Sequence, residues 1–125
     1  MATLNDVRRI ALALPETVES TDRFAVSVRN KDKLKGFVWV WLERLAPGKP
    51  RVPRPDVVAV RVANLTEKEL LLSMDAEKFF TEPHYNNYPA ILVRLKAVKV
   101  RELRVLIEDA WRCQAPRSLV KQWEE

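Results

Sequence analysis

The residues of this sequence that could carry chemistry near neutral pH are few and far apart. His84 is the only histidine and Cys113 the only cysteine, and 29 positions separate them. A histidine base needs a partner that orients it, and a nucleophilic thiol needs a neighbouring base or cation that lowers its pKa. Only Glu82 stands near His84, and nothing in the pattern places a base beside Cys113. We therefore expect no catalytic residue, a structural or surface position for His84, and Cys113 at the edge of the core.

Ligands for a metal or a cofactor are equally scarce. One histidine and one distant cysteine make a poor set for a transition metal. Hard cations need clustered oxygen ligands, and the first helical segment offers only Asp6, beside Arg8 and Arg9. The sequence thus predicts neither a metal site nor a cofactor.

Two clusters of basic residues are the strongest electrostatic feature. The chain has 22 basic and 17 acidic residues, a net charge of +5. Lysine and arginine bind phosphates by releasing counterions, so the clusters support the hypothesis of contact with DNA. Solvated turns that keep strand edges soluble are the competing interpretation. The clusters are Arg29, Lys31, Lys33 and Lys35, and then Arg44, Lys49, Arg51 and Arg54.

The two clusters flank the same apolar segment, residues 36–42, which is predicted to be a strand. They should therefore lie at opposite ends of it, roughly 23 Å apart at about 3.3 Å per residue. A duplex would have to lie along the sheet to touch both.

Aromatic residues alternate within that segment. A period of two places Phe37, Trp39 and Trp41 on one face of the strand. Three aromatics on one face are typical of sheets that stack single-stranded bases, and also of a core beneath helices. If the helices cover the aliphatic face instead, the aromatic face is left for a protein partner or a homodimer. The sequence leaves these alternatives open.

Hydrophobic periodicity predicts the elements that hold these residues. Capping boxes at Thr3 with Asp6 and at Thr66 with Glu69 are expected to open the first two helices. Trp111 lies on the apolar stripe of a long helix and is predicted to be buried. The predicted helices are 4–14, 66–74, 100–111 and a short one near 116–123; the predicted strands are 24–28, 36–42, 57–62, 78–82 and 90–95.

Polar and proline-rich segments separate these elements. Glu16–Asp22 is predicted as a connector, and Glu43–Asp56, which holds four of the eight prolines, as a stiff loop. The order predicts one domain over residues 1–125 with a two-layer α+β fold. We expect a five-stranded antiparallel sheet with helices on one face, in the order α-β(3)-α-β(2)-α.

The number of cysteines and the length of the apolar runs indicate the cellular compartment. A single cysteine excludes an internal disulfide and favours a reducing compartment. The first 15 residues lack the apolar core of a signal peptide, and the longest apolar run, 37–42, is too short to span a bilayer. We expect a cytoplasmic protein that does not enter a membrane.

Several segments resemble the MmcQ/YjbR family of small bacterial proteins. They are Leu14-Pro15, the segment Pro-His-Tyr-Asn-Asn-Tyr-Pro-Ala at 83–90, Ile91–Leu95, Leu103–Arg112 and Ala115–Arg117. The family signature loop supplies Pro83, His84, Tyr85, Tyr88 and Pro89. Residues 29–56 depart from the family pattern, because a tight glycine-containing turn is replaced by a charged one and a proline-rich insertion follows.

The resemblance implies a fold similar to type III secretion chaperones and, more loosely, to frataxin (CyaY-like). It also implies the DNA-binding label that the family often carries. The leading hypothesis is a non-enzymatic nucleic-acid-binding or regulatory module that acts through the basic hairpin loops. The alternative is a protein-interaction module, chaperone-like or dimerising, that uses an exposed sheet face. An enzyme with His84 as its acid–base group ranks third.

Overall fold

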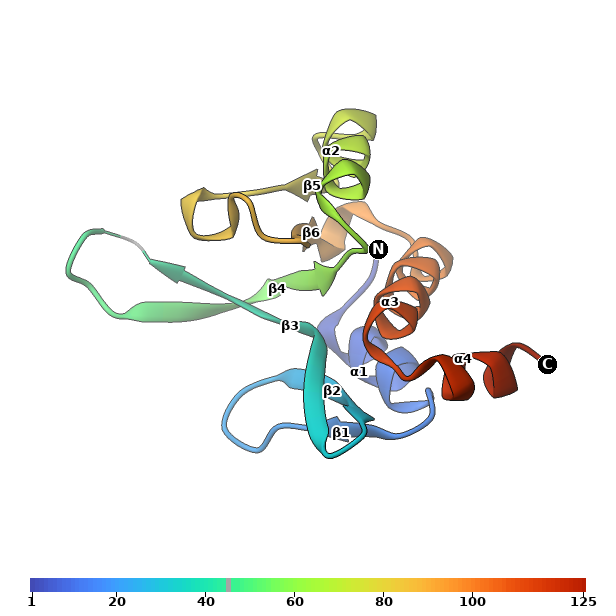
Figure 1. Ribbon diagram of the computed structural model, residues 1–125. Coiled ribbons are helices and arrows are strands. Elements are labelled where there is room, and N and C mark those ends of the chain that lie inside the picture. The colour runs from blue at the N-terminus through green and yellow to red at the C-terminus, as the bar shows by residue number, and fades with distance from the viewer. Residues whose placement is uncertain (45) are drawn as a thin grey trace.

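A six-stranded sheet organises the chain in the computed structural model, which describes residues 1–44 and 46–125. The strand order is β1-β2-β3-β4-β6-β5, and each neighbouring pair is antiparallel (Figure 1). The strands are β1 Thr17–Glu19, β2 Ala25–Asn30, β3 Lys33–Arg44, β4 Arg51–Arg61, β5 Phe79–Phe80 and β6 Ala90–Arg94. The helices are α1 Leu4–Leu12, α2 Leu65–Met74, α3 Val100–Gln114 and α4 Arg117–Glu124, with short 3₁₀ turns η1 Pro83–Tyr85 and η2 Leu95–Ala97.

The α+β class and the antiparallel sheet agree with the sequence prediction, but the strand count does not. The sixth strand, β1, lies in the segment expected to be a connector and pairs Thr17 with Val28 and Glu19 with Val26. Three residues are too few to show an alternating pattern. The strand exists because β2 offers its backbone groups as a template, which is a tertiary effect.

The proline-rich segment also differs from its prediction as a loop. Residues 43–44 continue β3 and residues 51–56 belong to β4, so the two strands extend as a paired ribbon. β6 pairs with Val57–Arg61 of β4, and within residues 1–44 and 46–125 the earlier part of β4 has β3 as its one neighbouring strand. Pro53 and Pro55 are tolerated there because an edge position needs no amide donor on its free side.

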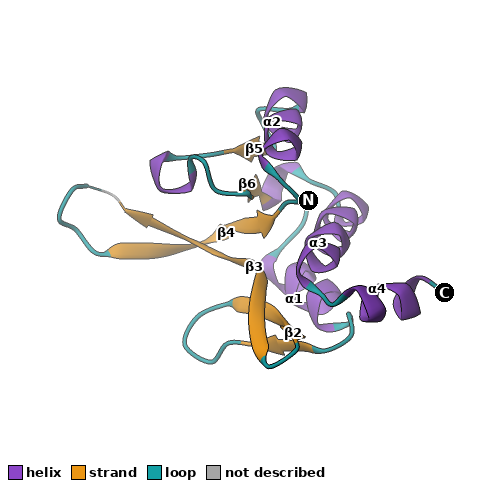
Figure 2. Cartoon of the chain, in the orientation of Figure 1, coloured by secondary structure: helices purple, strands orange, loops and turns teal. Residues whose placement is uncertain are grey.

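The helices cover one face of this sheet. Figure 2 shows α1, α2, α3 and α4 gathered on one side of the strands, whereas η1 lies away from them. The apolar faces of α1 and α3 meet the aliphatic residues of β2, β3 and β4, with Trp111 fully buried at the centre. Trp111 Nε1 donates a hydrogen bond of 3.0 Å to the carbonyl of Pro15.

The cap predicted for α1 is present, whereas the cap predicted for α2 is not. The capping box of Thr3 and Asp6 opens α1. At α2 the cap is Asn64, whose side chain accepts a bond of 2.9 Å from the Glu67 amide, rather than Thr66. Asn64 has the extended backbone of a cap, whereas Thr66 already lies inside the helix.

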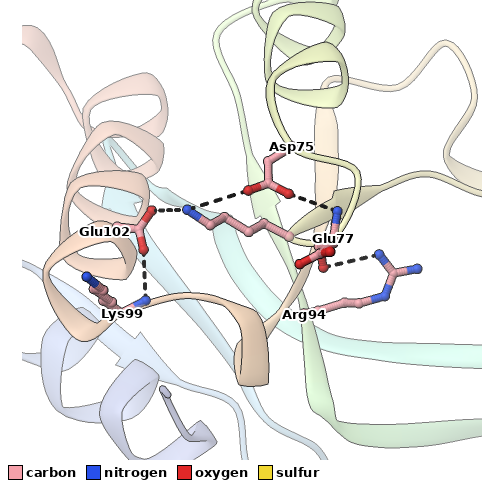
Figure 3. A network of polar contacts seen from close by, with 6 residues as sticks. Asp75, Glu77, Arg94, Lys99 and Glu102 are labelled. Carbon is pink, nitrogen blue, oxygen red and sulfur yellow. Dashed lines mark hydrogen bonds and ion pairs between the residues drawn. The ribbon is translucent and has the colours of Figure 1, made fainter.

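A polar network joins the end of α2 and the start of β5 to the start of α3 (Figure 3). Lys78 Nζ contacts Glu102 at 2.6 Å and Asp75 at 3.7 Å. Glu102 also accepts a bond from the Lys99 amide, and these contacts hold its pKa below the ordinary value, with Lys78 as the main cause. Arg94 donates to the carbonyl of Ala76. The network fixes where β5 meets the sheet.

Candidate nucleic-acid interface

The face of the sheet opposite α1 and α3, called the open face below, carries Trp39 and Trp41. The expectation that Phe37 shares this face is wrong. β2 pairs Val26 with Val38 but Ser27 with Gly36, so Phe37 is an extra residue in β3. This bulge turns Phe37 into the helix-side core, where it is fully buried.

A second, smaller core forms on the open face where residues 83–89, the signature loop, fold over β4 and β6. Tyr85 is buried there. Trp39 Nε1 donates a hydrogen bond of 3.1 Å to the Tyr85 hydroxyl, which fixes the indole. Desolvation raises the pKa of Tyr85, so this hydroxyl stays neutral. The buried members of this core are Val57, Ala59, Tyr85, Ala90 and Leu92, with Trp39, Trp41 and Phe80 packed against them.

Lys68 of α2 holds the signature loop in place. Its side chain is only 4% exposed, and its amine donates to the carbonyls of Tyr85 and, at 2.9 Å, Tyr88. Burial lowers the pKa of this amine. A lysine in a short leucine-rich helix carries no sequence signal for such a contact, and the sequence analysis missed it.

Of the other signature residues, two shape the backbone of the loop and two are exposed on its surface. Pro83 opens η1. His84 is exposed and meets the Tyr85 ring edge-on, with 5.3 Å between ring centroids. Tyr88 is exposed, and the Pro89 carbonyl accepts a bond from Val62. These contacts give the loop a structural role in covering part of the open face.

Four arginines lie on the open face by strand alternation. Arg29 alternates with the buried Val26 and Val28, and Arg54 pairs across the strands with Trp41. Arg61 and Arg94 were not predicted from the sequence, although the period of two within β4 and β6 places them on this face. Arg94 stacks on Phe80 at 4.1 Å and Arg61 on Tyr88 at 5.5 Å, measured from the guanidinium carbon to the ring centroid.

The two basic clusters lie at opposite ends of β3, as predicted, and the fold does not bring them together. One is the β2–β3 turn, residues 29–35. Of its members, Lys33 and Lys35 face the helix side, because Lys35 pairs with the buried Val28.

The other cluster lies on a ribbon, called the arm, in which residues 41–44 of β3 pair with residues 51–54 of β4. Figure 1 shows the arm extending away from the helices. Arg54 forms an ion pair with Glu43, and Arg51 donates at 2.9 Å to the Leu42 carbonyl. Arg44 donates at 3.3 Å to the Lys49 carbonyl. These contacts orient the arginines and leave further guanidinium N–H groups for a ligand.

The positive charge of the chain is concentrated at these two ends. Residues 29–35 contain four basic residues and one acidic residue, and so do residues 41–54, which gives +3 at each end. Because the whole chain carries +5, the remaining residues sum to −1. The net positive charge of the chain therefore comes from the hairpin ends.

Cys113 is exposed on α3 rather than packed at the core edge. Desolvation raises the pKa of its thiol above the ordinary value, which disfavours the nucleophilic thiolate. Among residues 1–44 and 46–125, no three side chains of the histidine, cysteine, aspartate and glutamate types cluster as metal ligands. The same residues include no helix with the length and apolar character needed to span a bilayer.

Comparison with known proteins places this geometry among relatives. A family model described as YjbR matches residues 12–113. The uncharacterized proteins Rv2570 of Mycobacterium tuberculosis and Mb2600 of Mycobacterium bovis are each 35% identical to the chain, over 97% of its length and 95% of theirs. The crystal structure of Deinococcus radiodurans DR2400, with the domain DUF419, aligns with a TM-score of 0.67 at 16% identity and covers 99% of this chain and 89% of that one. The likeness to DR2400 is one of fold.

Proposed function

Because this chain belongs to the YjbR family and its mycobacterial relatives are described as uncharacterized, we propose a function from its own geometry. The protein is a nucleic-acid-binding module that contacts phosphates through its two basic hairpin ends. It acts by binding, without turnover, and we place it in the cytoplasm.

One observation carries the proposal: the hairpin ends hold +6 of charge on a chain whose remaining residues sum to −1. Figure 1 shows the arm extending away from the helices, and its tip lies beyond the contact of Trp41 with Phe80 at its base. Exposed cations concentrated in this way favour a polyanion, since each phosphate contact releases condensed counterions. Solvated turns would need no such concentration.

Charge reversal at each end tests this function. We expect Lys31, Lys33 and Lys35 changed together to glutamate to weaken binding of a random-sequence oligonucleotide and to reduce its salt dependence. Each phosphate contact that the change removes should lower the slope of log affinity against log salt by about 0.7–0.9. Fluorescence anisotropy at several salt concentrations measures both quantities. Arg44, Lys49 and Arg51 changed to glutamate should act likewise, and this set keeps the Arg54–Glu43 ion pair.

A matched control separates local contacts from net charge. Lys96, Arg101 and Arg104 are exposed on η2 and α3, and reversing them changes the total charge equally. This variant should retain the wild-type slope. A wild-type protein that binds no nucleic acid at low salt would remove the proposal, and equal losses in all three variants would reduce it to an effect of net charge.

The absence of turnover has its own test. His84 is exposed and its ring contact is with Tyr85. We expect His84→Ala to fold normally and to change no hydrolytic or redox activity. A screen of hydrolase and oxidoreductase substrates that found an activity lost in this variant would refute the proposal of a non-enzyme.

A protein-interaction module is the second candidate, and a specific pair of residues favours it. Val18 and Leu34 are 41% and 51% exposed on the open face, outside the part that the signature loop covers. Exposed aliphatic residues on a sheet suit an apolar interface, as in a homodimer or a chaperone-like complex. Salt distinguishes the candidates, since phosphate contacts weaken steeply with salt and apolar contacts do not.

A further inference from the structure

We infer that the nucleic acid is single-stranded and lies along the open face between the two hairpin ends, with a base stacked on Trp39. This inference rests on the proposed function and specifies its ligand. The occupant is an oligonucleotide strand whose phosphates contact Arg29 at one end and Arg54 at the other.

The shape of β3 favours a flexible ligand. Figure 1 shows β3 running beside β2 and then turning in another direction as it enters the arm. Two irregularities accompany the turn: the bulge at Phe37, and residues 55–57 of β4, which lack partners on β3. Bulges bend and twist strands. A duplex is stiff over about 150 base pairs and would have to bend to reach both ends, whereas a single strand follows the path.

Small residues lie beside Trp39 on the surface between the ends. Ala25, Ser27 and Gly36 are the neighbouring residues on β2 and β3. Ring atoms of Trp39 lie 3.8 Å from where a Cβ of Gly36 would stand, so the indole leans over the glycine. Small side chains leave room for a planar base against the exposed part of the indole, and stacking on aromatics is how sheets hold unpaired bases.

The indole is already fixed in position. Its Nε1 bonds to Tyr85, and Tyr85 is in turn held through its carbonyl by Lys68. A ligand therefore does not have to order this side chain, which lowers the entropic cost of binding.

The charged side chains along the same path suit a single-stranded nucleic acid. Arg29 is exposed at the turn end, and Arg54 lies beside Trp41 at the arm end. Guanidinium groups bind phosphate by paired hydrogen bonds and also stack on planar rings. Arg61 and Arg94 already stack on aromatic rings of this face. A single-stranded oligonucleotide on this face would thus have an arginine for its phosphates at each end of an aromatic surface.

The experiment compares one labelled random-sequence oligonucleotide as a single strand and as a duplex, by anisotropy at fixed salt. We expect the wild type to bind the single strand at least about tenfold more tightly. Trp39→Leu should lower single-strand affinity by about 5- to 100-fold, the range for loss of one stacked base. Trp123→Leu, which removes a half-buried tryptophan on the helix side, is the matched control and should leave affinity unchanged.

A second variant guards against misfolding of Trp39→Leu. Ser27→Glu keeps the indole and places bulk and negative charge on the surface beside it, so it should weaken single-strand binding more than duplex binding. Thermal unfolding checks that each variant is folded. Equal affinity for both forms, with neither variant affected, would overturn this inference and leave the hairpin-end function standing. No binding of either form would remove both.

Discussion

Trp111→Ala is expected to lower the free energy of unfolding by about 3–5 kcal/mol, because it empties the centre of the helix-side core. The side chain has no exposed surface and packs against Trp123, with 5.1 Å between ring centroids. The change also removes the hydrogen bond to the half-buried Pro15 carbonyl, which adds to the loss. Chemical denaturation of both proteins measures the difference.

The neighbouring tryptophan provides the control for this effect. Trp123 is half-buried on α4 and contacts the same cluster from outside. Trp123→Ala should cost less, since part of its surface is exposed in the native protein. A loss below about 1 kcal/mol for Trp111→Ala would mean that α3 does not pack as described.

Lys68→Met should have the second large effect, on the signature loop and on stability together. Methionine replaces the aliphatic stem but leaves the carbonyls of Tyr85 and Tyr88 without the amine donor. We expect a loss of about 1–3 kcal/mol. Residues 84–88 should also exchange their amide protons faster, because Lys68 ties this loop to α2. Denaturation and hydrogen exchange provide the two measurements.

The pH dependence of this effect has a definite sign. Burial lowers the pKa of Lys68 below 10.5, so the native state releases the proton at a lower pH than the unfolded chain does. Between those two pKa values the unfolded state binds more protons, and stability therefore rises with pH. The neutral amine keeps two N–H groups for its two carbonyls. The stability gap between wild type and Lys68→Met should widen from pH 7 towards pH 10.

An exposed lysine is the control for the size of this effect. Lys96→Met on η2 removes no buried donor and should lower the free energy of unfolding far less than Lys68→Met does. If the Lys68 gap narrowed as pH rose, the amine would gain rather than lose proton affinity on folding, and the description of its burial would be wrong.

Local signals account for the parts of the fold that the sequence predicts. Thr3 and Asp6 cap α1 through atoms three residues apart, and the stripe containing Trp111 shows the helical period directly. Both are properties of a short segment. β1 and the paired part of β4 are different, because each forms on a template that another strand supplies. A proline such as Pro53 normally disfavours a strand, and the sequence does not show that this part of β4 lies at a sheet edge, where proline is tolerated.

The residues of the candidate site also fall into two groups, those that a local sequence pattern predicts and those that depend on distant contacts. Alternation correctly places Trp39 and Trp41 together but misassigns Phe37, because a bulge resets the alternation and has no marker in the sequence. Lys68 was missed, since its partners are backbone carbonyls 17 and 20 residues away. Which face the helices cover was left open by the sequence, and the contacts of α1 and α3 with the aliphatic residues answer it.

The hydrogen bond from Trp111 to Pro15 joins positions 96 apart, and two further bonds link Gln114 to Asn30 and Gly36. A growing chain on the ribosome therefore makes β2, β3 and β4 well before α3 exists to cover them. Throughout that interval the aliphatic face of β2, β3 and β4 is exposed to other nascent chains and to chaperones. Synthesis must pass residue 111 before the hydrophobic layer can close, so the last quarter of the chain decides whether the first half stays soluble.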